Sequence, residues 1–261
     1  DGPARWRAAN TSTWSMIDAG YSHAGTSDTP ESDGEQQLDW LTYHHHACID
    51  DLVPPQPPGG DYIVVDYNPY NLALSRSHLP STGDLVLSMQ AHVEGEGIFI
   101  VATSPRRDAL RLEINTASHQ VALHRGKTKL GSAPIPLLRL DNFLLEFGFV
   151  DAQAVLAVGG MEVLRLPLEI DSPMLGCATP FAIASTAGSA RVSALRITRD
   201  IYYTHPYDAK ATWQSETLAG DEYLLLGDNQ PLSLDSRTWP AAGLSRKKIL
   251  GEIILTDRNS R

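Results

Sequence analysis

Apolar and polar residues alternate with period two along most of the middle of the chain. This pattern is typical of strands that bury one face, since successive side chains of a strand point to opposite sides. Residues 109–115 are the clearest case, with Leu110, Leu112 and Ile114 on one face. The alternation predicts further strands at residues 61–67, 84–93, 97–102, 120–125, 142–150, 154–158, 161–166, 181–185 and 190–198. Strands that recur every 8 to 12 residues or so, with no amphipathic helix between them, predict an all-β fold, a two-sheet β-sandwich of the jelly-roll kind.

Residues 1–60 are less regular, and we expect them to pack as irregular chain on the edge of the sandwich. They contain four large aromatic residues, Trp6, Trp14, Trp40 and Tyr43, which are too many for a free tail. Edge packing is the role that we favour for them. The alternative is that they present flat apolar faces to a sugar or a protein partner.

Composition and charge narrow the function classes. The chain has 261 residues, of which 42% are hydrophobic and 20% are charged, as in soluble globular proteins. Its net charge of −10, with Lys and Arg scattered, argues against nucleic-acid binding. No apolar run approaches the ~20 residues of a membrane helix. Two cysteines, Cys48 and Cys177, are too few for a disulfide-rich scaffold, and the sequence leaves open whether they pair.

Three consecutive histidines, His44, His45 and His46, are a candidate metal site. On a strand at most His44 and His46 share a side, and tetrahedral zinc would need two further ligands from elsewhere. Asp50 and Asp51 lie nearby in the sequence, but no spacing selects them. We expect solvated loop histidines here and no metal.

Carboxylates near the expected turns, Glu94, Glu96 and Asp108, are candidates for calcium or sugar binding. Exposed turn carboxylates are common, and we expect no cofactor. Ser15 is a candidate nucleophile, but no glycine-rich turn surrounds it and no lysine precedes Lys127. Because a nucleophilic serine needs an adjacent base, we do not expect Ser15 to act as one.

The segment 220–251 differs in kind from the rest of the chain. A strand at residues 222–226 leads into a polar turn, and an Asp-x-Arg pair follows. Asp235 and Arg237 lie two residues apart, so in extended chain they share a face and can form a charge-assisted ion pair. We expect this pair to be partly shielded and modestly stabilising, and a second strand at residues 249–255 to close the unit.

This segment resembles the last conserved box of bacterial type I signal peptidases. The matching residues are Gly227, Asp228, Asn229, Ser233, Asp235, Ser236 and Arg237, followed more loosely by Leu250 and Gly251. The resemblance implies that Ser233 lies beside the catalytic lysine and helps to orient it. It also implies that Asp235 and Arg237 form a structural salt bridge near the site, and that Gly227 and Asp228 shape the strand beneath it.

Two essential elements of that family are missing from the chain. The nucleophile motif is Ser-Met-x-Pro, whereas Ser15-Met16 is followed by Ile17-Asp18. No lysine box is present, and His124-Arg125-Gly126, which some histidine-using relatives would suggest, lacks the following Pro-Gly-Asp. We therefore expect the chain to be the C-terminal part of a larger serine endopeptidase and to be inactive alone.

The parent would cleave signal peptides from preproteins on the extracytoplasmic face of the bacterial cytoplasmic membrane. Its membrane anchor would lie N-terminal to this chain, which would itself be soluble. We expect two domains: a sandwich at residues 1–200, inserted into the catalytic domain and similar to concanavalin-A or laminin-G domains, and the C-terminal part of the catalytic domain at residues 201–261. The alternative function is a carbohydrate- or protein-binding sandwich with a degenerate peptidase remnant.

Overall fold

A computed structural model of the chain was analysed. The structure describes residues 5–9, 11–25, 38–46, 63–65, 81–103, 109–136, 139–168, 177–200, 217–227, 233–241 and 243–251. The chain divides into two compact units. Asp1–Asp66 and Pro80–Asp200 form the first, here called the sandwich unit; Tyr67–Leu79 and Ile201–Arg261 form the second, here called the C-terminal unit.

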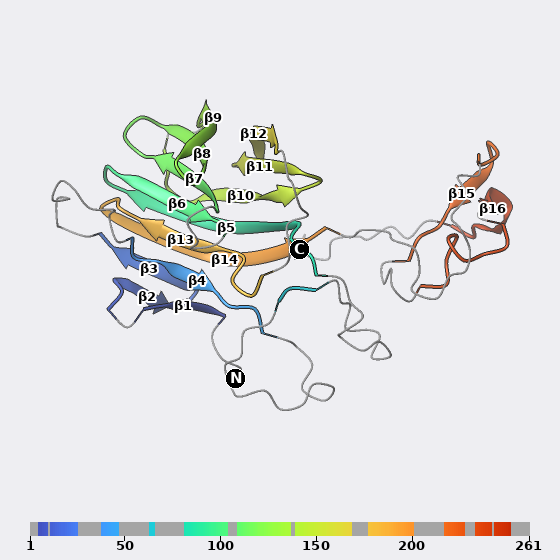
Figure 1. Cartoon of the computed structure of the whole chain (residues 1–261), viewed down its shortest axis with the longest axis horizontal. Coiled ribbons are helices and arrows are strands. Elements are labelled where there is room, and N and C mark those ends of the chain that lie inside the picture. Colours follow the sequence, from blue (N-terminus) through green and yellow to red (C-terminus); the bar gives the residue numbers. More distant parts are fainter. Residues whose placement is uncertain are drawn as a thin grey trace, which may run out of the picture. The chain divides into compact units, whose positions relative to one another are not determined.

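The sandwich unit is all-β, as the alternating pattern predicts, and all its paired strands are antiparallel (Figure 1). Sheet A contains, in spatial order, β1 (Trp6–Ala8), β4 (Leu41–Tyr43), β13 (Ala182–Ser185), β6 (Ile98–Ala102), β7 (Leu110–Asn115), β8 (Gln120–Arg125) and β9 (Thr128–Pro134). Sheet B contains, in spatial order, β12 (Met161–Pro167), β11 (Gln153–Val158), β10 (Phe143–Val150), β5 (Leu85–Glu94), β14 (Ser189–Arg199), β3 (Gly20–Ala24) and β2 (Trp14–Ile17).

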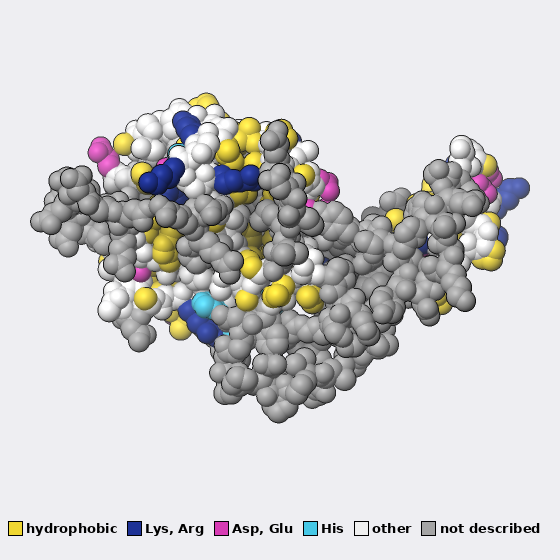
Figure 2. Space-filling model, viewed as in Figure 1, with side chains coloured by type: hydrophobic (Ala, Val, Ile, Leu, Met, Phe, Trp, Pro, Cys, Tyr) yellow, Lys and Arg dark blue, Asp and Glu magenta, His cyan; other side chains and the backbone are white. Residues whose placement is uncertain are grey.

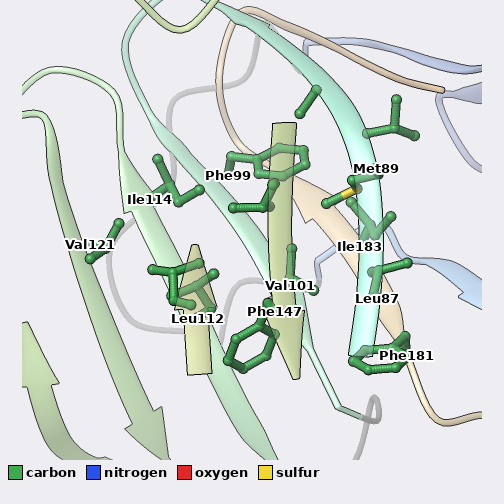
Figure 3. Close-up of a cluster of buried hydrophobic side chains, with 14 of the residues drawn as sticks. Leu87, Met89, Phe99, Val101, Leu112, Ile114, Val121, Phe147, Phe181 and Ile183 are labelled. Carbon is green, nitrogen blue, oxygen red and sulfur yellow. The ribbon is translucent and has the colours of Figure 1, made fainter. Parts of the chain in front are cut away.

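One hydrophobic core joins the inner faces of the two sheets. In β5 and β7 every second residue is buried, which places Leu87, Met89 and Leu112 inside. Figure 3 shows these side chains among those of β6, β10 and β13. Full burial of a side chain of this size stabilises a fold by about 1.5–3 kcal/mol. The core is therefore the main energetic reason that the two sheets stay together.

The N-terminal region is more regular than its sequence suggests. Its described residues contribute β1 and β4 to an edge of sheet A and β2 and β3 to an edge of sheet B, so the expectation of irregular chain is wrong there. Trp6, Trp14 and Tyr43 are buried in the core, which confirms edge packing for these three, while Trp40 is half-buried. Three buried rings are not accessible to a partner.

Two further strand expectations have a different outcome. β9 has no clear alternation and the sequence did not predict it. Within the expected strand 61–67 only residues 63–65 are described, and Val65 makes a single bridge to Ser81. A tight turn at Gly159-Gly160 joins β11 to β12, and both glycines have positive φ, 61° and 78°. None of the helical segments in the described ranges has the length and hydropathy of a membrane span.

A buried histidine links β3 to the chain before β4. His23 is only 1% exposed and its ring lies 5.0 Å from that of Trp14. Neither ring nitrogen has a hydrogen-bond partner, and Nε2 lies 3.8 Å from Asp39 Oδ2. Asp39 also accepts hydrogen bonds from the amide and hydroxyl of Thr13. Burial lowers the pKa of His23 more than the nearby Asp39 raises it, so folding favours the neutral form of the ring.

The burial of His23 predicts that the stability of the sandwich unit falls in acid. Because the folded-state pKa of His23 lies below its unfolded value of about 6.5, the unfolded chain binds the extra proton more readily. The free energy of unfolding should be highest above that value and fall as the pH drops through and below it. In His23→Leu this part of the pH dependence should disappear, as urea unfolding between pH 7.5 and about 5 would measure. His124→Gln, on an outward position of sheet A, is the control; an unchanged slope in His23→Leu would contradict the prediction.

Candidate functional site

The C-terminal unit contains a short hairpin beside the peptidase-like motif. β15 (Glu222–Leu224) pairs with β16 (Gly243–Ser245), and a 3₁₀ turn, Arg246–Lys248, follows. The expected second strand at residues 249–255 is wrong in its described part: residues 249–251 are not in a strand, and Leu250 is fully exposed. The real partner lies earlier, where Gly243 leaves room for the carboxylate of Glu222.

Asp235 and Arg237 form the ion pair that the sequence predicts. The guanidinium donates through Nε to Oδ1 at 2.8 Å and through Nη2 to Oδ2 at 2.7 Å. The two side chains are 6% and 0% exposed, so the pair is more deeply buried than the modestly stabilising surface pair we expected. A forked, desolvated pair has a defined geometry, and removing one partner would leave an uncompensated buried charge.

The Asp235 carboxylate also binds the backbone on both sides of the motif. Oδ2 accepts a hydrogen bond from the Gly227 amide at 2.9 Å, and Oδ1 accepts one from the Arg237 amide at 3.1 Å. Burial alone would raise the pKa of Asp235, but the hydrogen bonds from Arg237 and Gly227 outweigh it and hold the pKa below its usual value. The carboxylate therefore stays charged and ties the end of the strand to the loop that follows.

Ser236 makes a second tie between the same two segments. Its hydroxyl accepts a hydrogen bond from the Leu225 amide at 2.8 Å, and its own amide donates to the Leu225 carbonyl at 3.0 Å. Ser236 is 2% exposed. The residues at 225–227 and 235–237 are thus held by paired side-chain and backbone bonds, an arrangement that the sequence pattern alone did not reveal.

Ser233 packs directly against Gly227. A Cβ added to Gly227 would lie 2.6 Å from the Ser233 Cβ and would overlap its hydroxyl. The glycine of the motif is therefore needed for close approach, and it sets where Ser233 lies relative to Asp235. Asp228 and Asn229, the other two residues of the motif's turn, lie outside the described residues.

The other candidates from the sequence are not brought into one site. His46 Nε2 lies 2.9 Å from Arg7 Nη2, and His45 Nδ1 lies 3.3 Å from the Tyr43 hydroxyl. Two of the three histidines thus have side-chain partners from β1 and β4. Of the carboxylates named with them in the sequence, Asp50, Asp51 and Asp108 lie outside the described residues.

Ser15 and Glu94 both lie on sheet B. The Ser15 hydroxyl lies 3.1 Å from that of Ser22 and 3.4 Å from the Ser22 carbonyl oxygen. Glu94, at the end of β5, accepts hydrogen bonds from His92 at 2.9 Å and Ser189 at 3.3 Å; these lower its pKa. Glu96 lies in the turn after β5. Cys177 is half-buried and Cys48 lies outside the described residues, so their pairing stays open.

Three aspartates that the sequence analysis did not single out meet at one end of the central strands β5, β10 and β14 of sheet B. Carboxylate oxygens of Asp84, Asp151 and Asp200 lie within 4.8 Å of one another. Oxygen donors of this kind suit calcium or magnesium, although exposed acidic groups often lie together without an ion. Asp84 is buried and accepts a hydrogen bond from the Asp151 amide at 2.9 Å. Burial and the charges of Asp151 and Asp200 raise its pKa despite that bond.

The Lys and Arg side chains of the described residues do not gather into one large group on the face shown in Figure 2. On the face shown in Figure 2, the Lys and Arg side chains of the described residues form small separate groups, and no continuous basic surface is visible among them. The 3₁₀ turn at Arg246–Lys248 is the densest short group in the sequence of the C-terminal unit's described part.

Comparisons with known proteins give fold-level similarities alone. No protein-family model matches the chain, and no curated protein matches it. A carbohydrate-binding module, CBM66 from Bacillus subtilis, is 10% identical with a TM-score of 0.44 and covers 74% of this chain and 94% of its own. A galectin-like protein of unknown function from Bacillus subtilis is 8% identical with a TM-score of 0.47, covering 74% of this chain and 89% of its own. The galectin LEC-6 from Caenorhabditis elegans is 14% identical with a TM-score of 0.35, covering 46% of this chain and 88% of its own. At such identities and scores, these similarities carry no argument about function.

The contact between Gly227 and Ser233 predicts a specific sensitivity to a methyl group. Gly227→Ala should destabilise the C-terminal unit by about 1–3 kcal/mol, because the added Cβ overlaps Ser233. Amide hydrogen exchange at residues 222–227 would measure the loss. Gly220→Ala is a matched control, since nothing lies within 4 Å of a Cβ there. Equal exchange in the two variants would rule out the packing role of Gly227.

The crowding of three aspartates predicts that the sandwich unit becomes more stable when the charge of Asp84 is removed. Because the folded-state pKa of Asp84 is raised, the stability it contributes is lost as the pH rises through that pKa. Asp84→Asn keeps an acceptor for the Asp151 amide and removes the repulsion, so in EDTA it should unfold at higher urea than the wild type at pH 7. The difference should shrink in acid. A wild type that is more stable than the variant in EDTA at pH 7 would contradict this.

Proposed function

We propose that the C-terminal unit is the closing part of a signal-peptidase-like serine endopeptidase, and that the sandwich is a binding module carried by the same protein. The observation that carries the first part is the bonding around Asp235. Its carboxylate is bound to Arg237 and Gly227 at once, so three residues of the resembled motif form one hydrogen-bonded unit.

This arrangement suits a supporting role in catalysis. Arg237 is held by Asp235 in a desolvated fork, and Gly227 and Asp235 leave Ser233 a restricted position beside the strand end. A small hydroxyl fixed in this way can accept or donate one hydrogen bond to a neighbouring catalytic group. In the proposed parent that group is a lysine, which the resemblance places next to Ser233.

The chemistry of the parent would come from residues outside this chain. There a serine would attack the scissile carbonyl while a neutral lysine takes its proton, which requires a lysine whose pKa is lowered by burial. Ser233 would orient the lysine amine, and Asp235 and Arg237 would hold Ser233 in place. The preproteins that carry signal peptides would be the substrates.

The second part of the proposal rests on a different observation, the outer face of sheet B. Along β5 the outward residues are half-buried rather than exposed, as far as His92. Most of them are polar, so β5 presents a row of partly shielded polar side chains on this face. Such a surface can bind a glycan or a protein, and this is the candidate function that needs no peptidase.

The peptidase role predicts different results for the chain alone and for a longer protein. The purified chain should not cleave a fluorogenic signal-peptide substrate, because it contains neither the Ser-Met-x-Pro motif nor the lysine box. The same chain preceded by its genomically encoded upstream segment should cleave it. In that protein Ser233→Ala should lower kcat by up to about 100-fold with little change in KM, because a misplaced catalytic group slows the chemical step.

Ser245→Ala provides the matched control, since Ser245 lies in the same hairpin on β16 and outside the motif. Its kcat should equal that of the wild type. Cleavage by the isolated chain would contradict the proposal, and so would full activity of Ser233→Ala in the longer protein.

A further inference from the structure

The outer face of sheet B carries a two-row grid of side chains on neighbouring strands. In the first row Ser22 of β3 lies beside Arg191 of β14, which lies beside His92 of β5. The alternate residues of these strands, His23, Val192 and Ala91, are buried, so the row faces outward. Neighbouring strands lie about 4.8 Å apart, so the three side chains span about 10 Å.

The second row continues the grid two residues further along. Ser193 of β14 lies beside Gln90 of β5, and Gln90 lies beside Leu144 of β10. All three are half-buried. Rows two residues apart in a strand are separated by about 6.8 Å, so the two rows cover an area comparable to one or two sugar rings.

A shallow depression opens at the Gln90 side of this grid. It has a volume of about 550 Å³ and is lined by Gln90, Leu144, Arg139, Asp141, Asn142 and the Gly159-Gly160 turn. At Gly160 nothing would lie within 4 Å of a Cβ, so the wall of the depression is open. Arg139 Nε lies 3.2 Å from Asp141 Oδ2, which places a donor fork and a carboxylate side by side at its rim.

Around β6 and β13 of sheet A the outward residues Ile100, Ala182 and Ala184 are apolar and at most 3% exposed. The half-buried polar residues on the outer face of that sheet, such as Arg111, Glu113 and His124, lie on β7 and β8. The strands of sheet B also contain no lysine, and their basic residues are arginine and histidine, which lose less conformational freedom on hydrogen bonding than lysine does.

The chemistry of the grid matches the hydroxyl groups of a sugar. A sugar hydroxyl, like that of serine, donates one hydrogen bond and accepts two, so its site needs both donors and acceptors. Arg191 supplies donors, Gln90 supplies both, and Leu144 supplies an apolar surface for the C–H face of a ring. A protein partner would instead be expected to meet large aromatic or aliphatic anchors; Leu144 is the largest apolar side chain in the grid.

The charges of the surrounding residues favour a neutral ligand. Beyond the first row, the positive charge of Arg191 acts on the carboxylate of Glu94. Beyond the second row, Ser88 of β5 lies between Arg196 of β14 and Glu146 of β10, so one arginine and one glutamate flank it. Arg139 and Asp141 balance each other at the depression. These described residues around the grid leave no excess of positive charge for a sulfated or sialylated chain.

We infer that a neutral glycan binds across Gln90 and Arg191, with its end in the depression beside Leu144. This inference rests on the proposed binding role of the sandwich and names its site and ligand class. The ligand class follows from the polar side chains of the grid and not from the N-terminal aromatic residues, because Trp6, Trp14 and Tyr43, which could have met a sugar or a protein, are buried.

The test uses the full 261-residue chain and an array of neutral, sialylated and sulfated oligosaccharides, together with a phage-displayed peptide library. The strongest neutral glycan is then titrated by calorimetry into the wild type, Gln90→Ala and Arg191→Ala. Each substitution should weaken binding about tenfold, the loss expected for one hydrogen bond to a polar or charged group. Arg111→Ala is the matched control on the outer face of sheet A and should bind like the wild type; thermal unfolding checks that every variant is folded.

The outcomes separate the site from the function. Neutral-glycan binding that survives both substitutions would overturn the site and leave the binding role of the sandwich intact. Binding confined to peptides or to anionic glycans would overturn the ligand class. If no glycan on the array and no peptide in the library binds saturably, both this inference and the binding role on which it rests are overturned.

Discussion

The buried carboxylate of Asp235 is the interaction on which the C-terminal unit depends. It accepts two hydrogen bonds from the Arg237 side chain and two from backbone amides, and it has almost no contact with water. Removing either partner of such a pair costs about 3–5 kcal/mol, because a charge is left without compensation. Among the described residues of this unit, the apolar side chains of Tyr223, Leu224 and Leu225 are substantially exposed. In that described part, polar bonding holds the motif in shape.

The sandwich unit follows the opposite principle. Its two sheets are joined by a continuous apolar core, and its buried polar groups are few. His23 and the aspartate cluster are exceptions. His23 lies on β3, close to Asp39 in the chain before β4. The aspartates lie at the start of β5 and just after β10 and β14. The outer face of sheet B is free to carry polar side chains because the inner face alone supplies the stability. Binding and stability can thus be separated on one sheet.

Much of the sandwich could be predicted from the sequence, and the reason is burial on one face. β5, β7 and β11 alternate in burial, β8 and β10 do so over most of their length, and all five were predicted to within one or two residues. β1 and β4 are three residues long, too short to show a period, and β9 has no fully buried residue, so these strands depend on tertiary pairing that no local pattern records. The same holds for β16, whose pairing depends on the room left at Gly243.

The site was predictable in part for a similar reason. The two-residue spacing of Asp235 and Arg237 predicts their ion pair, since both ends of the contact lie in one short segment. The Ser236–Leu225 bonds and the Gly227–Ser233 contact join segments across a turn, and spacing alone does not show them. Asp84, Asp151 and Asp200 are far apart in the sequence. They meet because β5 begins beside the ends of its antiparallel neighbours β10 and β14.

The central claim is that a charged Asp235 organises the motif, and an NMR titration of its side-chain carboxyl carbon tests this most directly. The resonance should titrate with a pKa below the usual value of 3.8, and the Gly227 amide proton should move with the same midpoint because it donates to that carboxylate. In Arg237→Gln the pKa should rise, since the strongest bonds to the charged form are lost. An Asp235 that titrates at or above 3.8 in the wild type, or a Gly227 amide that does not respond, would contradict the account.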